Sequence, residues 1–177
     1  ILMYMDKTYC ELKKKISSYN LGVIKFKRYI CLNEHVLGRE GRLRIELLNN
    51  IKRERDGEKI DESLMRNCLR MFVDVDLPNN NSQLYDIEFE KYFQNETKQY
   101  YQYESELFIT QNTVPEYLIK VEQRLIQERN RGDSYIPKKY TRETLKNIVE
   151  YELITRYADT LVNNPNTGCN DMFNKHS

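Results

Sequence analysis

The stretch that decides the fold is residues 84–131, which read LYDIEFEKYFQNETKQYYQYESELFITQNTVPEYLIKVEQRLIQERNR. Aromatic and aliphatic residues recur in it at spacings of three and four, the period of one face of an α-helix. The pattern predicts a long amphipathic helix over 84–109, a break at Gln111-Asn112 and a second helix. The residues expected on the buried face of the long helix are Tyr85, Phe89, Tyr92, Phe93, Tyr100, Tyr103 and Leu107.

The start of the second helix carries its own local signal. Thr113 is followed three residues later by Glu116, a spacing that lets the two residues cap the first turn reciprocally. Pro115 stands in that turn, where its missing N–H is harmless. Gly132-Asp133-Ser134, followed by Pro137, is expected to end the helix. The residues expected on its buried stripe are Tyr117, Leu118, Val121 and Leu125.

Helical periodicity continues on both sides of this stretch. We predict helices over residues 1–17 and 19–35, a third that stops at Gly57, a fourth capped by Asp61, and a last long helix capped by Thr141. The inward-facing residues expected in them are Leu2, Met5, Tyr9, Leu12 and Ile16; Val23, Phe26 and Ile30; Leu43, Leu47, Leu48 and Ile51; Leu64, Cys68, Met71, Phe72 and Val75; and Leu145, Ile148, Val149, Tyr157 and Leu161.

No stretch alternates convincingly enough to predict a strand. Breaks are expected at Gly38 and Gly41 and at the Asn79–Asn81 run, and the tail after Asn163 is polar. Helices of unequal length joined by short links are typical of a degenerate helical repeat. The sequence therefore predicts an all-α fold, a helical solenoid of antiparallel bundles.

Composition limits the classes of function. Hydrophobic residues are 40% of the 177, charged residues 31%, and mean hydropathy is −0.78, as expected for packed helices with wide polar faces. The net charge of +1, from 28 basic and 27 acidic residues, argues against a nucleic-acid partner. No apolar run approaches the ~18 residues of a membrane span, and no signal peptide is visible. The chain opens on Ile1 inside a helical pattern, so we expect it to be part of a longer protein.

Residues that carry chemistry are scattered. The four cysteines (Cys10, Cys31, Cys68 and Cys169) form no CxxC motif and there are two histidines, so we expect no metal site and no cofactor. The carboxylate pairs Glu104/Glu106 and Glu150/Glu152 are two residues apart, and such pairs point to different sides of a helix. We therefore expect no catalytic residue and no enzyme. Reduced thiols without an export signal indicate the cytoplasm or nucleus.

Two other groups of residues allow two interpretations each. Tyrosine occurs 14 times and tryptophan is absent; Tyr92, Tyr100, Tyr101 and Tyr103 are either core filler, which the period favours, or a base-stacking platform. Two small basic clusters are either a solvated face or an anion contact, here too with the first favoured. Their members are Lys13, Lys14 and Lys15, and Arg39, Arg42 and Arg44.

The first helix has a candidate binding face. At 100° per residue, Lys7 points away from the apolar stripe of that helix, and Met3 and Tyr4 lie beside Lys7. Methionine and aromatic side chains on a helix surface are good docking anchors. Docking of a partner and packing against another part of the protein remain equally open for this face.

Several motifs together resemble the cullin family. ILMYMDKTY is followed ten residues later by YNLGVIKF; IKRERDGEKID and RNCLRM follow; FEKYFQNETKQYYQYESELFITQNTVPEYLIKVEQRLIQE and VEYELITRY come later. The likeness covers residues 1–162 and is nearest to the cullin that pairs with BTB-domain adaptors. The 37–45 stretch, the Asn79–Asn81 run and the tail beyond Asn163 depart from the family pattern.

The resemblance implies a function. Cullins are scaffolds of multisubunit ubiquitin ligases, with a stalk of five-helix repeats. Residues 1–18 would be the last helix of the first repeat, 19–132 the second repeat, and 133–177 a linker and the start of the third. Tyr4 and Lys7 match the family's adaptor contact, so with Met3 they are the predicted site. A RING protein would bind the absent C-terminal half. The alternatives are an unrelated α-solenoid interaction module, a nucleic-acid-binding helical domain and an enzyme.

Overall fold

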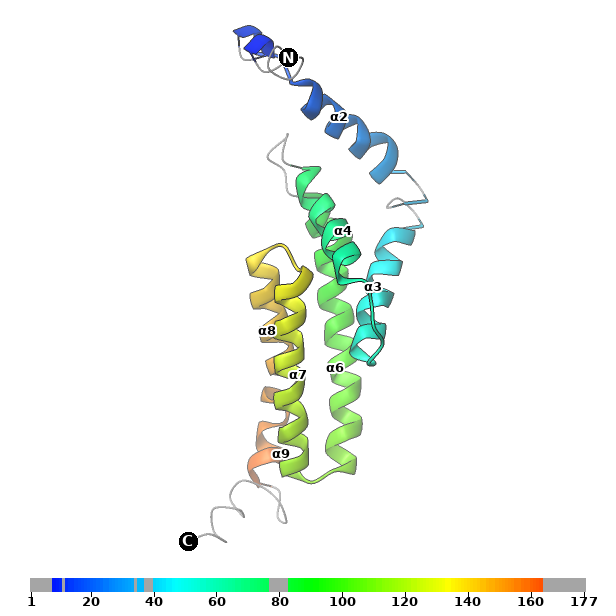
Figure 1. The fold of residues 1–177 in the computed structure, drawn as a ribbon. Coiled ribbons are helices and arrows are strands. Elements are labelled where there is room, and N and C mark those ends of the chain that lie inside the picture. The colour runs from blue at the N-terminus through cyan, green and yellow to red at the C-terminus, as the bar shows by residue number, and fades with distance from the viewer. Residues whose placement is uncertain (1–7, 11, 34, 37–39, 77–82, 164–177) are drawn as a thin grey trace. The chain divides into compact units, whose positions relative to one another are not determined.

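The structure is a computed structural model, and it describes residues 8–10, 12–33, 35–36, 40–76 and 83–163. These residues form helices and turns, with no strand among them (Figure 1). The prediction of an all-α fold is confirmed. Gly38, Asn79–Asn81 and the tail after Asn163 lie outside the described residues. The chain divides into two compact units, residues 1–89 and 90–177.

The first unit holds the shorter helices. Its elements are α2 (Ser18–Phe26), the π-helical η1 (Lys27–Cys31), α3 (Arg42–Arg55), α4 (Glu62–Asp74), α5 (Gln83–Tyr85) and the π-helical η3 (Asp86–Glu90), which crosses into the second unit. Gly57, with φ +97°, follows α3 in the left-handed region that glycine adopts at low cost. Asp61 accepts a hydrogen bond from the Leu64 N–H at 2.9 Å. The predicted end of α3 and the cap of α4 are both confirmed.

The buried face of α4 differs from the predicted one. Leu64 is 60% exposed, whereas Leu69 is fully buried. Cys68 and Met71 are half-buried. The buried side chains of this helix are Met65, Leu69, Phe72 and, at the cap, Val75. The observed buried face is turned by about one residue from the predicted one. Apolar residues occupy two neighbouring faces of α4, and helical period alone does not show which of the two is buried.

The second helix also differs from its prediction. Phe26 and Ile30 are exposed and Val23 is only half-buried, so the inward face predicted for them is wrong. Cys31 is the buried residue of the η1 turn, and helical structure ends there rather than at His35. The widened π-helical turn from Lys27 shifts Ile30 relative to a constant 100° step, whereas Val23 and Phe26 precede that turn, in a helix that buries none of its own side chains.

The second unit is built on three long helices. They are α6 (Lys91–Gln111), α7 (Val114–Tyr135) and α8 (Lys139–Leu153), followed by the 3₁₀ turn η4 (Thr155–Tyr157) and α9 (Ala158–Asn163). Figure 1 shows α6, α7 and α8 side by side, and α8 packs against both of the others. We call α6, α7 and α8 the three-helix bundle. The predicted last long helix is thus interrupted at Ile154, where α8 ends and the 3₁₀ turn η4 follows.

Every fourth residue of α6 is buried, so its buried side chains form one line along the helix. These buried residues are Phe93, Thr97, Tyr101 and Ser105. The prediction for the long helix is correct for Tyr85, Phe89 and Phe93, which are buried, and wrong for the exposed Tyr92, Tyr103 and Leu107. Where tyrosines cluster at 100, 101 and 103, the period cannot tell which ring turns inward, and the small Thr97 and Ser105 give no apolar signal.

Helix α7 begins as predicted. The Thr113 N–H donates to the Glu116 carboxylate at 2.9 Å, and both halves of the capping box are present. Tyr117 and Val121 are buried as expected, but Leu118 is exposed and Leu125 is half-buried.

The end of α7 and the start of α8 correct two predictions. Helix α7 runs through Gly132 to Tyr135 and stops before Pro137. A Cβ on Gly132 would lie 3.3 Å from the Arg142 Cγ, so glycine here allows close packing of α8 instead of breaking the helix. Thr141 is not the cap: α8 begins at Lys139, and the buried Thr141 hydroxyl donates to the Glu90 carboxylate.

Candidate interaction surfaces

The predicted adaptor-binding residues Met3, Tyr4 and Lys7 lie outside the described residues. The helical turn after them is described at residues 8–10 and ends near Lys14, whose φ is +48°. The predicted inward stripe includes Tyr9, Leu12 and Ile16, which are all exposed here, whereas Leu2 and Met5 are not described. Burial of those three residues was a wrong prediction for this chain. Periodicity shows which side of a helix is apolar, but it does not supply the element that covers that side.

The α2–η1 segment (residues 18–31) is held to the end of α4 by two contacts. The Lys27 ammonium forms an ion pair with Asp76, and the Asp76 carboxylate also accepts the Leu84 N–H at 2.7 Å. Cys31 Sγ lies 3.6 Å from the Met71 Sδ. Since α2 buries none of its own side chains within the described residues, these contacts position it. The sequence gives no signal for the pair of Lys27 and Asp76, which are 49 residues apart.

Two of the described thiols, Cys31 and Cys68, are poor nucleophiles. Burial raises the pKa of Cys31, and Asp76 adds to the rise while Lys27 opposes it. Burial also raises the pKa of Cys68. A thiol with a raised pKa stays protonated at neutral pH, and the thiolate is the reactive form. These cysteines therefore act as small packing residues.

The predicted carboxylate pairs separate as expected. The Glu104 carboxylate accepts hydrogen bonds from the Arg124 guanidinium. Arg124 Nε lies 3.1 and 3.0 Å from the two carboxylate oxygens. Glu106 instead pairs with Arg156 at 3.0 Å. Burial opposes the charge of Arg124, yet its pKa is raised because the hydrogen bonds and charge of Glu104 outweigh that burial. Each carboxylate is engaged by a cation, so neither is positioned to share a proton with the other.

Tyrosines fill the interior of the three-helix bundle and bring their hydroxyls to polar partners. The Tyr101 hydroxyl donates to the buried Glu128, which also pairs with Arg131. The Tyr117 hydroxyl donates to the Leu153 carbonyl at 2.7 Å. Burial raises the pKa of Tyr117, and Tyr157 and Glu104 add to the rise. The core-filler interpretation is therefore correct for Tyr101.

The buried pair Glu128 and Arg131 was missed at the sequence level. Both residues fall at helical spacing on the same side as Tyr117 and Val121, so the apolar stripe of α7 continues as a polar one. The i, i+3 spacing of opposite charges was a usable signal, but the same spacing is common on exposed faces. Charged side chains at helical spacing are mostly exposed, so the sequence alone does not mark this pair as buried.

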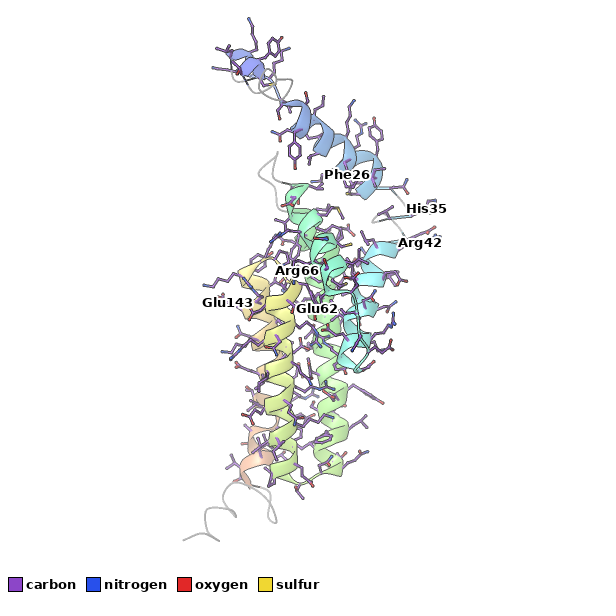
Figure 2. The ribbon with its side chains drawn as sticks, in the orientation of Figure 1. Phe26, His35, Arg42, Glu62, Arg66 and Glu143 are labelled. Atoms are coloured by element: carbon purple, nitrogen blue, oxygen red, sulfur yellow. The ribbon has the colours of Figure 1, made fainter. Side chains whose placement is uncertain are left out.

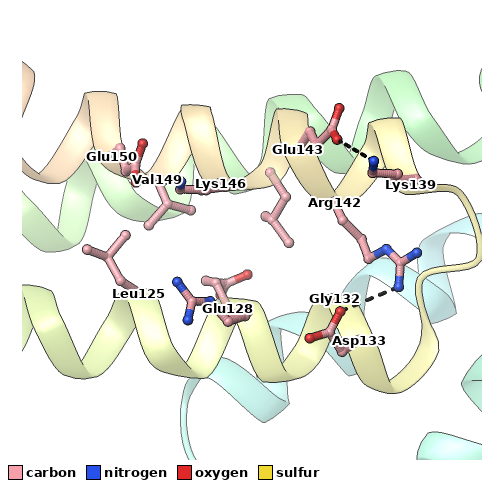
Figure 3. Close-up of a pocket in the computed structure, with 12 residues that line it drawn as sticks. Leu125, Glu128, Gly132, Asp133, Lys139, Arg142, Glu143, Lys146, Val149 and Glu150 are labelled. Atoms are coloured by element: carbon pink, nitrogen blue, oxygen red, sulfur yellow. Dashed lines mark hydrogen bonds and ion pairs between the residues drawn. The ribbon is translucent and has the colours of Figure 1, made fainter.

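A groove of about 410 Å³ lies between α7 and α8 (Figure 3). Its apolar lining residues are Leu125, Leu145 and Val149, and its charged lining residues are four acids and four bases. Most of these charges are paired with one another: Arg142 with Asp133 at 3.4 Å, Lys139 with Glu143 at 3.6 Å, and Lys146 with Glu150 at 3.5 Å. The groove therefore has no dominant sign of charge.

Two features are absent from the described residues. No three or more His, Cys, Asp or Glu side chains there gather closely enough to hold a metal ion. In the same part of the chain, none of the helices combines the length and the apolar character that crossing a bilayer requires.

The whole sequence matches the model of one protein family. The model of the cullin alpha solenoid domain matches residues 1–177. The chain belongs to the cullin family. The resemblance read from the motifs of residues 1–162 is thereby confirmed, and so is the helical solenoid.

Similar proteins agree with this assignment. This cullin chain is 35% identical to cullin-3A of Arabidopsis thaliana and 32% identical to cullin-3 of Dictyostelium discoideum; each alignment covers 97% of this chain and 22% of the relative. It is 29% identical to cullin-4A of Homo sapiens over 92% of this chain and 20% of that protein. The chain thus spans about a fifth of the length of these relatives.

Proposed function

We propose that this chain is a non-catalytic scaffold segment of a cullin-RING ubiquitin ligase, where it sets the distance between a substrate adaptor and a RING-bound ubiquitin-conjugating enzyme. The observation that carries the proposal is the match of all 177 residues to the cullin solenoid. The dense helix packing of the three-helix bundle and its internally paired charges suit a spacer. They offer surfaces for docking rather than groups for chemistry.

The proposal assigns a role to each part of the chain. Residues 1–18 are the last helix of one cullin repeat, 19–132 the next repeat, and 133–177 a linker and the start of a third. Met3, Tyr4 and Lys7 contact a BTB-domain or related adaptor. The RING protein binds the part of the ligase beyond this chain. The complex works in the cytoplasm and nucleus.

The mechanism is geometric. Holding a substrate lysine near the thioester of the conjugating enzyme raises its effective concentration, provided that the spacer has the right span and does not bend freely. Closely packed helices resist deformation because any shift opens voids or breaks paired buried groups. The buried network of Glu128, Arg131 and Tyr101, which joins α6 to α7, supports this proposal.

The spacer role is tested by a flexible insertion in the full-length protein. A Gly-Ser insertion between Phe89 and Glu90, where the two compact units divide, should leave adaptor binding intact and reduce ubiquitin transfer to the substrate. The control is the same insertion at Asn112, in the turn between α6 and α7, which lengthens a turn inside one unit. Equal transfer by both insertion variants and the wild type would contradict the spacer role.

The adaptor contact is tested separately by Tyr4→Ala in the full-length protein. Loss of an aromatic anchor of about 2 kcal/mol predicts adaptor binding about 30-fold weaker by calorimetry. Tyr103→Ala is the matched control, because Tyr103 is an exposed tyrosine of α6. Unchanged adaptor binding by Tyr4→Ala would remove this residue from the site. Failure of the full-length protein to assemble with any RING protein would favour an α-solenoid module outside the ubiquitin pathway.

A further inference from the structure

One segment of this chain carries charge of a single sign. Residues 12–33 hold six of the 28 basic residues and none of the 27 acidic ones, which leaves 22 basic and 27 acidic residues in the rest of the chain. The near-zero net charge of the whole chain hides this asymmetry. A local cationic surface on an otherwise acidic chain attracts an acidic partner to that place alone.

One basic residue of this segment is paired inside the protein, and the other five are exposed to solvent. Lys27 is on the side of α2–η1 that faces α4, and its charge is paired with Asp76. Asn20, Val23 and Ile24 lie half-buried on the same side. The other five cations are exposed: Lys13, Lys14, Lys15, Lys25 and Arg28. Of these five, Lys25 and Arg28 lie on the outward face of α2–η1, the face that points away from α4, whereas Lys13–Lys15 precede α2 in the chain.

Aromatic residues line that same outward face. Tyr19 is 75% exposed, Phe26 is 41% exposed, and Tyr29 is 63% exposed. Figure 2 labels Phe26 on α2. At 100° per residue, Tyr19, Gly22 and Phe26 fall within about 60° of one another, and Tyr29 continues the line in η1. A Cβ on Gly22 would meet nothing within 4 Å, so the space between the rings is open. Arg28 lies 5.6 Å from the ring centre of Tyr29.

The start of α2 adds to the positive potential. Ser17 caps the helix through its hydroxyl, which accepts the Asn20 N–H at 3.2 Å, and no acidic residue occurs in the first turn. The N-terminus of a helix carries a partial positive charge, and Lys13–Lys15 come just before it in the chain. Basic residues at this end are unfavourable for the isolated helix, and an external anion offsets that cost.

We propose that the outward face of α2–η1 is a docking surface for an acidic amphipathic helix of another protein. Tyr19, Phe26 and Tyr29 would take the apolar side of that helix, as rigid rings at helical spacing do in helix–groove recognition. Lys25 and Arg28 would pair with its carboxylates along one edge. The surface is separate from Met3, Tyr4 and Lys7, and the proposal does not depend on the adaptor contact.

Charge distribution favours a protein partner over a nucleic acid. A long polyanion that followed the chain beyond this segment would meet the acidic excess of the remaining residues and be repelled. A helix of a few turns is short enough to stay over the cationic face. The α7–α8 groove is a weaker candidate because its charges largely pair with one another.

The first test uses a defined probe and the full-length protein. The probe is a fluorescent amphipathic peptide of leucine and glutamate, longer than about 15 residues so that it forms a helix. Its anisotropy should rise on binding, and Lys25→Glu with Arg28→Glu should weaken binding about tenfold or more. Tyr19→Ala with Tyr29→Ala should weaken it comparably. The matched control is Lys91→Glu with Lys98→Glu on α6, which changes the net charge equally at two other exposed lysines and should leave the affinity unchanged.

The second test identifies what covers the face in the cell. A photo-crosslinking amino acid replaces Gly22 in the full-length protein, and mass spectrometry maps the crosslinked segment. The expected product joins Gly22 to an acidic helical segment of another protein, and it disappears in the Lys25→Glu, Arg28→Glu variant but persists in the Lys91→Glu, Lys98→Glu control.

Several results would overturn the proposal. They are crosslinks only to this protein's own chain, no crosslink at all, or equal peptide binding by the test and control variants. Charge-dependent binding to an RNA oligonucleotide or to phosphatidylserine vesicles, without binding to the acidic peptide, would assign the face to that ligand instead. Circular dichroism of each variant excludes unfolding as the cause.

Discussion

The three-helix bundle and the α2–η1 segment use the same residue type in opposite ways. In the bundle, Tyr101 and Tyr117 are buried, and each hydroxyl has a polar acceptor inside the protein. In α2–η1, Tyr19 and Tyr29 are exposed, and Arg28 lies 5.6 Å from the ring centre of Tyr29. Helical spacing alone therefore does not decide whether a tyrosine is buried. These two buried tyrosines of the bundle are ones whose hydroxyls reach an acceptor inside the protein.

The two regions also differ in what holds them. The bundle is fixed by contacts among its three helices and by a buried ionic network. The α2–η1 segment buries only Cys31 and is retained mainly through Lys27 and Asp76. Elements with few buried contacts open locally at low free energy. We therefore expect the bundle to unfold cooperatively and α2–η1 to yield first.

The largest effect is expected inside the bundle. Glu128→Ala removes the acceptor that Arg131 and Tyr101 share. A buried cation that loses its counter-charge costs about 3–5 kcal/mol. Chemical denaturation should show this loss in the free energy of unfolding, and Glu122→Ala on the exposed side of α7 should change it by less than about 0.5 kcal/mol. Equal effects of the two substitutions would mean that the network is not buried.

The next effect concerns α4, the helix to which α2–η1 is tied. Leu69→Ala should lower the free energy of unfolding by about 2–5 kcal/mol, because it leaves a cavity at a fully buried site. Leu64→Ala, at an exposed position, should cost less than about 0.5 kcal/mol. Thermal or chemical unfolding of the two variants decides which column of α4 is buried. The reverse order would restore the face predicted from sequence.

A smaller effect is expected at the joint of α2–η1. Asp76→Ala removes the acceptor of both the Lys27 ammonium and the Leu84 N–H, so it should cost about 1.5–3 kcal/mol. Limited proteolysis should then cut within residues 18–31 sooner, while the bundle keeps its resistance. Asp74→Ala, at an exposed carboxylate of α4, is the control. If both variants are cut alike, the joint does not retain the segment.

The smallest effect is at the cap of α7. Thr113→Ala should cost about 1 kcal/mol, the usual value for an N-cap. Hydrogen bonds from Thr113 lower the pKa of Glu116, so the capping contribution is fully present above the ordinary pKa of glutamate and is lost as pH falls through the lowered value. The melting temperature of the wild type should therefore drop more on acidification than that of Glu116→Gln, which removes the titrating carboxylate; Thr113→Ala keeps the backbone N–H that lowers this pKa most. Parallel acid profiles would show that Glu116 does not contribute through this cap.

Sequence patterns predicted the features that depend on local chemistry. The capping box at Thr113, the cap at Asp61 and the stop at Gly57 follow from a few adjacent residues. Gly132 was predicted to end the helix because glycine often breaks helices. In the structure, its missing side chain leaves room for Arg142 of the next helix. That role depends on a residue ten positions away, which no local signal contains.

Residues whose environment is set by other helices were harder to predict. Tyr101 is buried in line with Phe93 and Thr97, and its hydroxyl donates to Glu128 on α7, a partner that the sequence of α6 does not reveal. The pair Lys27 and Asp76 depends on how α2–η1 lies on α4. The predicted site at Met3, Tyr4 and Lys7 rests on the family resemblance and a helical wheel, and it stays a prediction.

The most direct test of the contrast between the two regions is hydrogen–deuterium exchange resolved by peptide along the chain. Amides of α6, α7 and α8 should exchange slowly, at rates set by global unfolding, whereas amides of residues 18–31 should exchange faster by local opening and accelerate further in Asp76→Ala. Equal protection of residues 18–31 and the bundle, or rapid exchange in the middle of α7, would contradict the account.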